Sequence, residues 1–320
     1  MSNGPIAKQP LIVDSSESCA QAAPALAARG IKVVMRYYSR PGYPNTILSA
    51  AEATAIHASG IAIGLVYQFH SNKIESFDTT SAHEAAKACM KRDAGLNPGK
   101  PETIHHPQDT VIYFGVDGDL TGVADPDERQ HVIDTLMTFF KIVGDDFSAK
   151  SAPFKIGVYG SGDVCQRLIA AGRASYGWLA GFSTGWTGMR DVYNETTAVP
   201  HWHMFQNALE VPLAAPVDTN ILNPRAGGLI GAFDQSGLIG PLDDSAIRAT
   251  LRFVTAAEAT LFASEDEHPL GTVKRNRMVS MLAPGPVWSK VETTFHSGNT
   301  GTTKQGYMKS TLLGTIDRMV

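Results

Sequence analysis

Three sequence features are scarce or missing, and each absence excludes a kind of site or a class of partner. The chain of 320 residues has three cysteines, Cys19, Cys89 and Cys165, without CxxC spacing, which argues against a disulfide framework and a structural zinc site. No run of about 18 apolar residues occurs, so no transmembrane helix is predicted. The net charge is -4 and basic residues form no tract, so we expect neither nucleic acid nor a membrane as a partner.

The amino terminus also lacks a recognisable export pattern. Its first residues, MSNGPIAKQPLIVDSS, contain no charged region followed by an apolar core of about 7–15 residues, so no Sec signal peptide is predicted. We therefore expect a protein that is cytoplasmic as made. If it acts on a target periplasm or cell wall, we expect a non-Sec machine to export it.

The sequence does contain a regular alternation of apolar runs and helical patterns. The runs that predict strands lie at 10–16, 31–39, 61–69, 109–119, 154–162, 176–183 and 201–206. Near-continuous apolar strands are typical of a parallel sheet covered by helices. We therefore predict an α/β fold, a (β/α)8 TIM-like barrel, over residues 1–235. The absence of GxGxxG and Walker motifs disfavours a doubly wound nucleotide-binding sheet.

The pattern changes after residue 235. Ile247, Leu251, Val254 and Leu261 are spaced as on one helix, which predicts a helical connector over 236–265. The tail holds short strand-like pieces, VWSKVETTF and QGYMKSTLL, separated by HSGNTGTTK. Residues 266–320 are therefore predicted to form a small all-β domain.

Acidic, aromatic and amide side chains follow the predicted strands, at the end of a barrel where functional groups gather. Sugar rings stack on aromatic faces, and paired carboxylates carry out glycoside hydrolysis. The residues predicted to be catalytic are Asp14, Asp117, Asp119 and Asp218. Those predicted to bind substrate are Tyr38, Tyr67, Gln68, Tyr159, Trp178, Gln206 and Asn220.

The run VIYFGVDGDL at 111–120 ends in two aspartates one residue apart. Residues i and i+2 of a strand share a side, so Asp117 and Asp119 would both face the barrel mouth if the strand extends that far. Close carboxylates raise one another's pKa, which is one route to a protonated general acid. Two alternatives stay open: DGD is also typical of a turn, and Asp14 could cap the helix that follows it.

Several segments, among them LIVDSS, GIKVVMRYYSR, VIYFGVDGD and FKIGVYGSGDVCQRL, occur in an order that resembles a known family. They resemble glycoside-hydrolase-like barrels, formerly classed as a domain of unknown function and related to the family 25 lysozymes, over roughly residues 10–225. That resemblance implies cleavage of the muramic acid to glucosamine bond of peptidoglycan. Family 25 lysozymes typically end their fourth strand in Asp-x-Glu, with Glu as the acid, and Asp119 stands at the Glu position here. By the same resemblance, Asp117 assists, and Asp14 and Asp218 are the other rim acids.

The tail resembles a bacterial SH3-like module through VWSKVE and GYMKSTLL. In wall hydrolases such modules often bind wall peptides, so this resemblance implies peptides as a second ligand. A domain used only for packing or dimerisation is the alternative.

These patterns predict a cofactor-free, lysozyme-like hydrolase acting on peptidoglycan glycan strands. The alternative is a non-catalytic wall-binding protein on a degenerate barrel. The missing signal peptide favours an antibacterial effector, with an immunity protein as partner, over a phage endolysin. A divalent-metal site at His201 and His203 is a further alternative, but no HExxH spacing supports it, so no metal is predicted.

Overall fold

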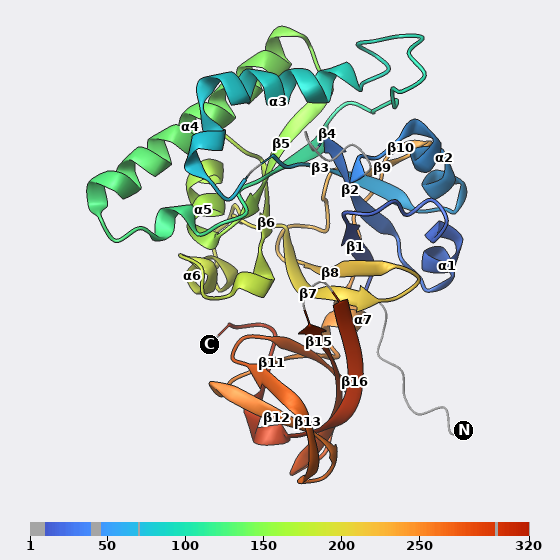
Figure 1. Ribbon diagram of the computed structural model, residues 1–320, viewed down its shortest axis with the longest axis vertical. Coiled ribbons are helices and arrows are strands. Elements are labelled where there is room, and N and C mark those ends of the chain that lie inside the picture. Colours follow the sequence, from blue (N-terminus) through green and yellow to red (C-terminus); the bar gives the residue numbers. More distant parts are fainter. Residues whose placement is uncertain (1–9, 40–45, 70, 298–299, 320) are drawn as a thin grey trace.

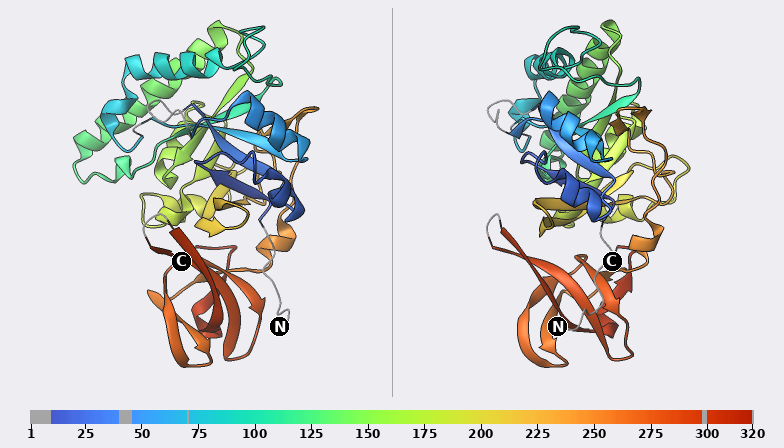
Figure 2. Two further views of the ribbon diagram at one scale, coloured as in Figure 1. Left: turned by 45° about the vertical axis from the view of Figure 1, so that its right-hand side comes forward. Right: turned by 90° about the vertical axis from the view of Figure 1, so that its right-hand side faces the viewer.

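The computed structural model describes residues 10–39, 46–69, 71–297 and 300–319. A layer of helices surrounds a closed barrel, and a β-domain lies beside one part of the barrel wall (Figures 1 and 2). Among the described helices, none is long and apolar enough to cross a membrane.

Eight strands close the barrel, because β3 pairs with β4 as well as with β2. The strands are β1 (Ile12–Ser15), β2 (Val33–Ser39), β3 (Ala62–Tyr67), β4 (Thr110–Gly115), β5 (Phe154–Gly160), β6 (Tyr176–Leu179), β7 (Met204–Pro212) and β8 (Pro216–Leu222). From β1 to β7 all neighbouring strands in the chain run parallel, as the apolar runs predict.

The predicted (β/α)8 layout is wrong in its last unit. Strand β8 pairs antiparallel with both β7 and β1, so the barrel is mixed and mostly parallel. A turn at 213–215 joins β7 to β8, and so short a connection permits only an antiparallel hairpin.

Helices join the parallel strands and cover the outside of the barrel (Figure 1). They are α1 (Ala23–Ala28), α2 (Ala50–Ala58), α3 (Thr79–Lys91), α4 (Pro126–Ala149), α5 (Gly162–Ala170) and α6 (Met189–Tyr193), with the short helices η2 (Ile74–Phe77), η3 (Leu120–Gly122) and η4 (Gly181–Ser183). The longest, α4, begins where Asp125 accepts hydrogen bonds from the N–H groups of Asp127 and Glu128, with Pro126 in its first turn. Its apolar face, which includes Leu136 and Phe140, is buried.

Alternating side chains divide the core into two layers. On β2, Val33 and Met35 pack inside the barrel, whereas Val34 packs outward under the helices. The chain after β8 covers the end of the barrel where the parallel strands begin. There the Val111 N–H donates to the carbonyl of Gly231. Two short strands there, β9 (Phe233–Asp234) and β10 (Gly237–Leu238), extend the sheet from β3. The opposite end, where the parallel strands finish, is called the mouth of the barrel below.

The helical connector predicted over 236–265 is wrong. Only α7 (Ser245–Arg248) is helical there, and strands β11 (Leu251–Val254) and β12 (Glu258–Ser264) follow it. Leu251 and Phe253 are buried, as are Ala259 and Leu261, so burial has the strand period of two. The helical spacing seen in the sequence joined residues of the short helix α7 and of two separate strands.

The C-terminal domain is therefore larger than predicted and begins at β11. Its sheet has seven strands in the order β13-β12-β16-β15-β14-β11-β17, and neighbouring strands run antiparallel. The remaining strands are β13 (Glu267–Lys274), β14 (Met278–Ala283), β15 (Trp288–Ser297), β16 (Thr300–Lys309) and β17 (Leu313–Thr315), with η5 (Ser310–Leu312) between the last two. The SH3-like character of this domain stays a prediction.

A buried ion pair connects the first strands to the helical layer. Arg36 is fully buried on the outer side of β2, and its Nε donates to Glu52 Oε1 on α2 at 2.7 Å. The same guanidinium donates to the carbonyls of Ser15 and Thr46, and Glu52 accepts from the N–H of Cys19. One pair therefore fixes the end of β1, the segment before α1 and the segment before α2.

Removing Arg36 would leave the Glu52 carboxylate buried without a cation. We expect Arg36→Met to lower the free energy of unfolding by about 3–5 kcal/mol, measured by urea denaturation. Lys141→Met breaks the exposed pair with Asp145 on α4 and is the control, with an expected cost below about 1 kcal/mol. Equal losses in the two variants would contradict this role for Arg36.

Candidate active site

Two aspartates face each other at the barrel mouth. Asp14 on β1 lies directly opposite Asp218 on β8 in the antiparallel register. Asp14 points to the same side as Ile12, which lies in the core inside the barrel. The two carboxyl groups lie close enough for one amide, that of Gln206, to reach both, so a proton bound by one carboxyl can be shared with the other. The structure thus brings together two of the four predicted acids as a proton-sharing pair.

Three further donors hold this pair. Gln206 Nε2 bridges the two acids, at 3.1 Å from both Asp14 Oδ1 and Asp218 Oδ2. Asn220 Nδ2 donates to Asp14 Oδ2 at 2.7 Å, and the backbone N–H of Glu210 donates to Asp218 Oδ1 at 2.8 Å. Asp14 is therefore no helix cap, because its oxygens accept from side chains of β7 and β8.

Two aromatic side chains orient the amides. Tyr159 Oη donates to Gln206 Oε1 at 3.0 Å, and Trp178 Nε1 donates to Asn220 Oδ1 at 2.8 Å. Each amide oxygen is thereby occupied, so each amide NH2 is directed at the acids. Tyr159 and Trp178 also contact each other edge to face, with ring centroids 4.9 Å apart. These four predicted binding residues form the support of the acid pair.

Burial determines the electrostatics of the pair. It raises the pKa of Asp218 to about 8, with the charge of Asp14 as the next cause. Burial likewise raises the pKa of Asp14, to about 6, against hydrogen bonds that lower it. Since the two carboxyls are coupled and both pKa values are raised, the pair binds one proton near neutral pH.

Asp117 lies near Tyr159, the tyrosine that orients Gln206. Burial raises the pKa of Tyr159 well above its ordinary value, and the charges of Asp117 and Asp14 add to that rise. Asp117 is exposed, and its Oδ2 accepts from Gln68 Nε2 at 2.9 Å. The same Gln68 nitrogen donates to Ser71 Oγ, so Gln68 is fixed beside the acid as a predicted site residue.

The expectation that Asp117 and Asp119 share a strand side is wrong. Strand β4 ends at Gly115, and both acids lie in the segment that leads to η3. Asp119 accepts from Thr187 at both oxygens, from the backbone N–H at 2.9 Å and from Oγ1 at 3.1 Å. The turn therefore separates the two acids, and Asp119 anchors the loop before α6.

One comparison with known proteins identifies the family. The sequence model of the family described as Rv2525c-like, glycoside hydrolase-like domain matches residues 24–216, more than half of the chain. The chain belongs to this family. The matched range of this Rv2525c-like domain includes Asp117 and Gln206 but neither Asp14 nor Asp218.

Two curated relatives come from Bacillus subtilis strain 168. The uncharacterized protein YbfG is 25% identical over 261 residues, which are 77% of this chain and 32% of YbfG. The uncharacterized protein FadG is 27% identical over 170 residues, which are 52% of this chain and 27% of FadG. The chain thus spans about a third or less of the length of these relatives.

Solved structures resemble the chain more distantly. The Tat-secreted Rv2525c of Mycobacterium tuberculosis is 18% identical with a TM-score of 0.47, covering 67% of this chain and 95% of that protein. A family 25 glycosyl hydrolase from Bacillus anthracis is 13% identical with a TM-score of 0.39, covering 69% and 94%. A muramidase from Acremonium alcalophilum is 12% identical with a TM-score of 0.36, covering 75% and 96%.

Two predicted aromatic residues lie outside the mouth of this Rv2525c-like domain. Tyr38 is fully buried under the helices, 5.0 Å from the ring of His106, and Tyr67 packs outward against Phe114. Strand alternation explains both errors, because neighbouring residues face opposite sides. Tyr37, the neighbour of Tyr38 on β2, packs inward like Val33 and Met35, and its effect on the pKa of Tyr159 places it near that tyrosine.

Glu210 was also missed by sequence reasoning. It reaches Asp218 through its backbone N–H, and its charge raises the pKa of both Asp14 and Asp218. No sequence pattern predicts that the backbone N–H of a given residue, here Glu210, will donate to an acid of the site. Tyr37 could have been found by counting alternate residues from Val33 and Met35, which the apolar run already places on one side.

The two histidines considered as metal ligands have structural roles in the Rv2525c-like domain. His201 Nδ1 contacts Glu195 at 2.6 Å, and His203 Nδ1 accepts from the N–H of Gly177. Within the described ranges, no group of three or more His, Cys, Asp or Glu side chains could hold a metal ion. Cys165 is buried, and burial raises its pKa to about 12, so the thiol stays protonated at neutral pH.

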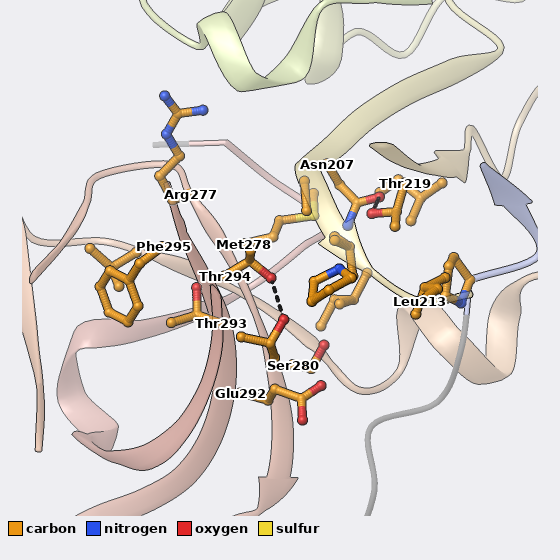
Figure 3. Close-up of a pocket in the computed structure, with 18 of the residues that line it drawn as sticks. Asn207, Leu213, Thr219, Arg277, Met278, Ser280, Glu292, Thr293, Thr294 and Phe295 are labelled. Carbon is orange, nitrogen blue, oxygen red and sulfur yellow. Dashed lines mark hydrogen bonds between the residues drawn. The ribbon is translucent and has the colours of Figure 1, made fainter. Parts of the chain in front are cut away.

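A cavity of about 540 Å³ lies away from the acids, between the barrel and the β-domain. Asn207 and Thr219 line it from β7 and β8, and Met278, Thr294 and Phe295 line it from the β-domain (Figure 3). Both barrel residues neighbour site residues in sequence, so strand alternation turns them to the outer face. This cavity is therefore separate from the mouth.

The raised pKa of Asp218 predicts how stability depends on pH. The folded protein holds a proton on this carboxyl up to about pH 8, whereas the unfolded carboxyl has its ordinary pKa of 3.8. The folded state therefore binds more protons between these values, and the free energy of unfolding falls as pH rises through that window. We expect Asp218→Asn to reduce this fall, measured by urea midpoints from pH 5 to 9.

The exposed Asp145 on α4 gives a matched control. Asp145→Asn should leave the pH dependence of the wild type unchanged. A wild-type stability that is no steeper in pH than that of Asp218→Asn would contradict the raised pKa.

Proposed function

We propose that the chain is a glycoside hydrolase whose general acid is the pair formed by Asp14 and Asp218, which holds one proton between its two carboxyl groups. The observation that carries the proposal is this pair of facing acids, bridged by Gln206, at the mouth of a glycoside-hydrolase-like barrel. A carboxyl that keeps its proton near neutral pH is what protonation of a glycosidic oxygen needs. Asp218, with the higher pKa, donates that proton.

Asp14 keeps the acid in place during this step. When Asp218 has lost its proton, the two carboxylates would repel each other, but Gln206 Nε2 donates to both and Asn220 Nδ2 donates to Asp14. These donors stabilise the negative charge that remains. Water then adds to the anomeric carbon of the sugar, and the proton that this water loses restores the pair.

Asp117 supplies the second carboxylate. It is exposed at the mouth beside Tyr159, and the hydrogen bond from Gln68 holds it there. A carboxylate in this position stabilises the positive charge that develops on the sugar ring as the bond breaks. Tyr37 and Tyr159 provide aromatic surface for that ring.

The proposed substrate is the glycan strand of peptidoglycan. Support comes from the resemblance of VIYFGVDGD and its neighbouring segments to relatives of the family 25 lysozymes. Wall peptides as ligands of the β-domain, export by a non-Sec machine and a cognate immunity protein belong to the same proposal.

Hydrolysis of purified sacculi tests the acid. We expect Asp218→Asn to lower the rate of product release by about 100-fold to 10,000-fold, because the transferred proton is lost. Mass spectrometry of the released fragments identifies the bond that is cut. Wild-type activity should fall as pH rises above about 8, where Asp218 loses its proton.

Asp119→Ala compares the two candidate acids. Asp119 is the acid that the lysozyme resemblance implies, yet both of its oxygens accept from Thr187. If Asp218 is the acid, Asp119→Ala retains more activity than Asp218→Asn and keeps the loss of activity above about pH 8. A larger loss in Asp119→Ala would transfer the role to Asp119.

A glycan-binding protein without turnover is the second candidate. The observation that favours it is the saturation of the acid pair by Gln206, Asn220 and the N–H of Glu210. For this function we expect the double variant Asp117→Ala, Asp218→Asn to pull down sacculi as well as the wild type does. No fragment release by the wild type over hours, with binding intact, would decide for this candidate.

A further inference from the structure

Strand β7 departs from regular geometry at the level of Asp218. Its register with β8 shifts between Ala208 and Val211, so that Leu209 and Glu210 together lie opposite Asp218. Glu210 has a φ of 48°, in the left-handed region that non-glycine residues adopt only where their surroundings enforce it. This bulge is what directs the Glu210 N–H at Asp218 Oδ1.

The β-domain lies against this bulge. Both strands of the β15–β16 hairpin contact β7, and the two views of Figure 2 place β16 beside that part of the barrel. The closest approach is at Gly301 on β16, where an added Cβ would lie 1.9 Å from the carbonyl oxygen of Glu210. Only glycine lets the two backbones lie this close.

We propose that the β15–β16 hairpin is part of the candidate active site, and that Gly301 is a positioning residue that holds the Glu210 bulge against Asp218. The contact covers the carbonyl side of Glu210, while its N–H side faces the acid. The C-terminal domain thereby acts on the acid pair without contributing a side chain to it. The catalytic consequence rests on the proposed function, whereas the positioning itself does not.

Several groups act on Asp218 from the elements around it. Asp14 faces it from β1, Glu210 from β7, and Tyr159 from β5 through Gln206. Glu210 acts in two opposite ways: its N–H lowers the pKa of Asp218, and its carboxylate charge raises it. The hydrogen bond is the larger of the two effects. Displacing the bulge should therefore raise this pKa, and removing the charge alone should lower it.

The experiment is a carbon-13 NMR titration of the aspartate carboxyls in the full-length chain, with Asp218 assigned by its loss in Asp218→Asn. Gly301→Ala places a methyl against the Glu210 carbonyl and should move the Asp218 titration upward by about 0.5–1 pH unit, the size expected for one weakened hydrogen bond. Glu210→Gln keeps the N–H and removes the charge, so the titration should move downward.

Gly306→Ala is the matched control. Gly306 lies on the same strand, and its added Cβ would meet the carbonyl oxygen of Phe262 at 2.3 Å, within the β-domain. That variant creates a backbone clash within the β-domain but leaves Glu210 alone, so the Asp218 titration should not move. An equal shift in both variants, or no shift in Gly301→Ala, overturns the proposal.

A second variant tests whether the effect of Gly301→Ala comes from a distorted hairpin. The added Cβ at position 301 would also lie 2.9 Å from Thr294 Cγ2, so Gly301→Ala combined with Thr294→Ser removes the clash inside the hairpin and keeps the one with Glu210. The same upward shift is expected. The two proposals fail separately: a shift without glycan hydrolysis by the wild type supports positioning alone. Hydrolysis with an unmoved titration overturns positioning and leaves the proposed function in place.

Discussion

The antiparallel pairing of β8 with β1 places Asp218 directly opposite Asp14, and the candidate site is arranged around that pairing. A parallel eighth strand would have finished at the mouth, whereas β8 begins there. Asp218 and Asn220 on this strand both face inward. Asp218 lies beside Asp14, and Asn220 lies deeper in the barrel, opposite Ile12. The closure of the barrel and the assembly of the acid pair are therefore the same structural event.

Two buried polar networks stand on opposite sides of the first strands. Inside the barrel, Gln206 and Asn220 satisfy the acids, and Tyr159 and Trp178 satisfy the amides in turn. Outside it, Arg36 and Glu52 hold the end of β1 from the helical side. Buried polar groups are costly unless every one has a partner, so together these networks fix the position of Asp14 closely.

The β-domain and the barrel meet where the barrel is least regular. The bulge of β7 faces Asp218 on one side and Gly301 on the other. The hydroxyl of Tyr193 on α6 donates to the carbonyl of Ile316, and Asn194 hydrogen-bonds to the backbone of Met319, so the end of the chain is also attached to the barrel. The second domain is thus held to the barrel both at the bulge beside the acids and at α6.

Local patterns were enough to predict the parallel βα units, the residue types at their ends and the all-β tail, because apolar runs and strand-end acids can be seen in short stretches of chain. Prediction failed where the answer depended on partners distant in the chain. The helical spacing of Leu251, Val254 and Leu261 hid two strands whose burial comes from neighbours in a sheet. Tyr38 and Tyr67 were placed on the wrong side because each lies one residue from an inward position.

The acid pair shows most clearly what local patterns can predict and what depends on partners distant in the chain. Asp14 and Asp218 were both predicted from strand ends, yet the sequence emphasised Asp117 and Asp119, which are neighbours in the chain. Which carboxyls share a proton depends on the closed barrel, because 203 intervening residues separate Asp14 from Asp218 and the barrel must close before they meet. The raised pKa of Asp218 has the same origin: burial and a neighbouring charge are properties of the closed fold.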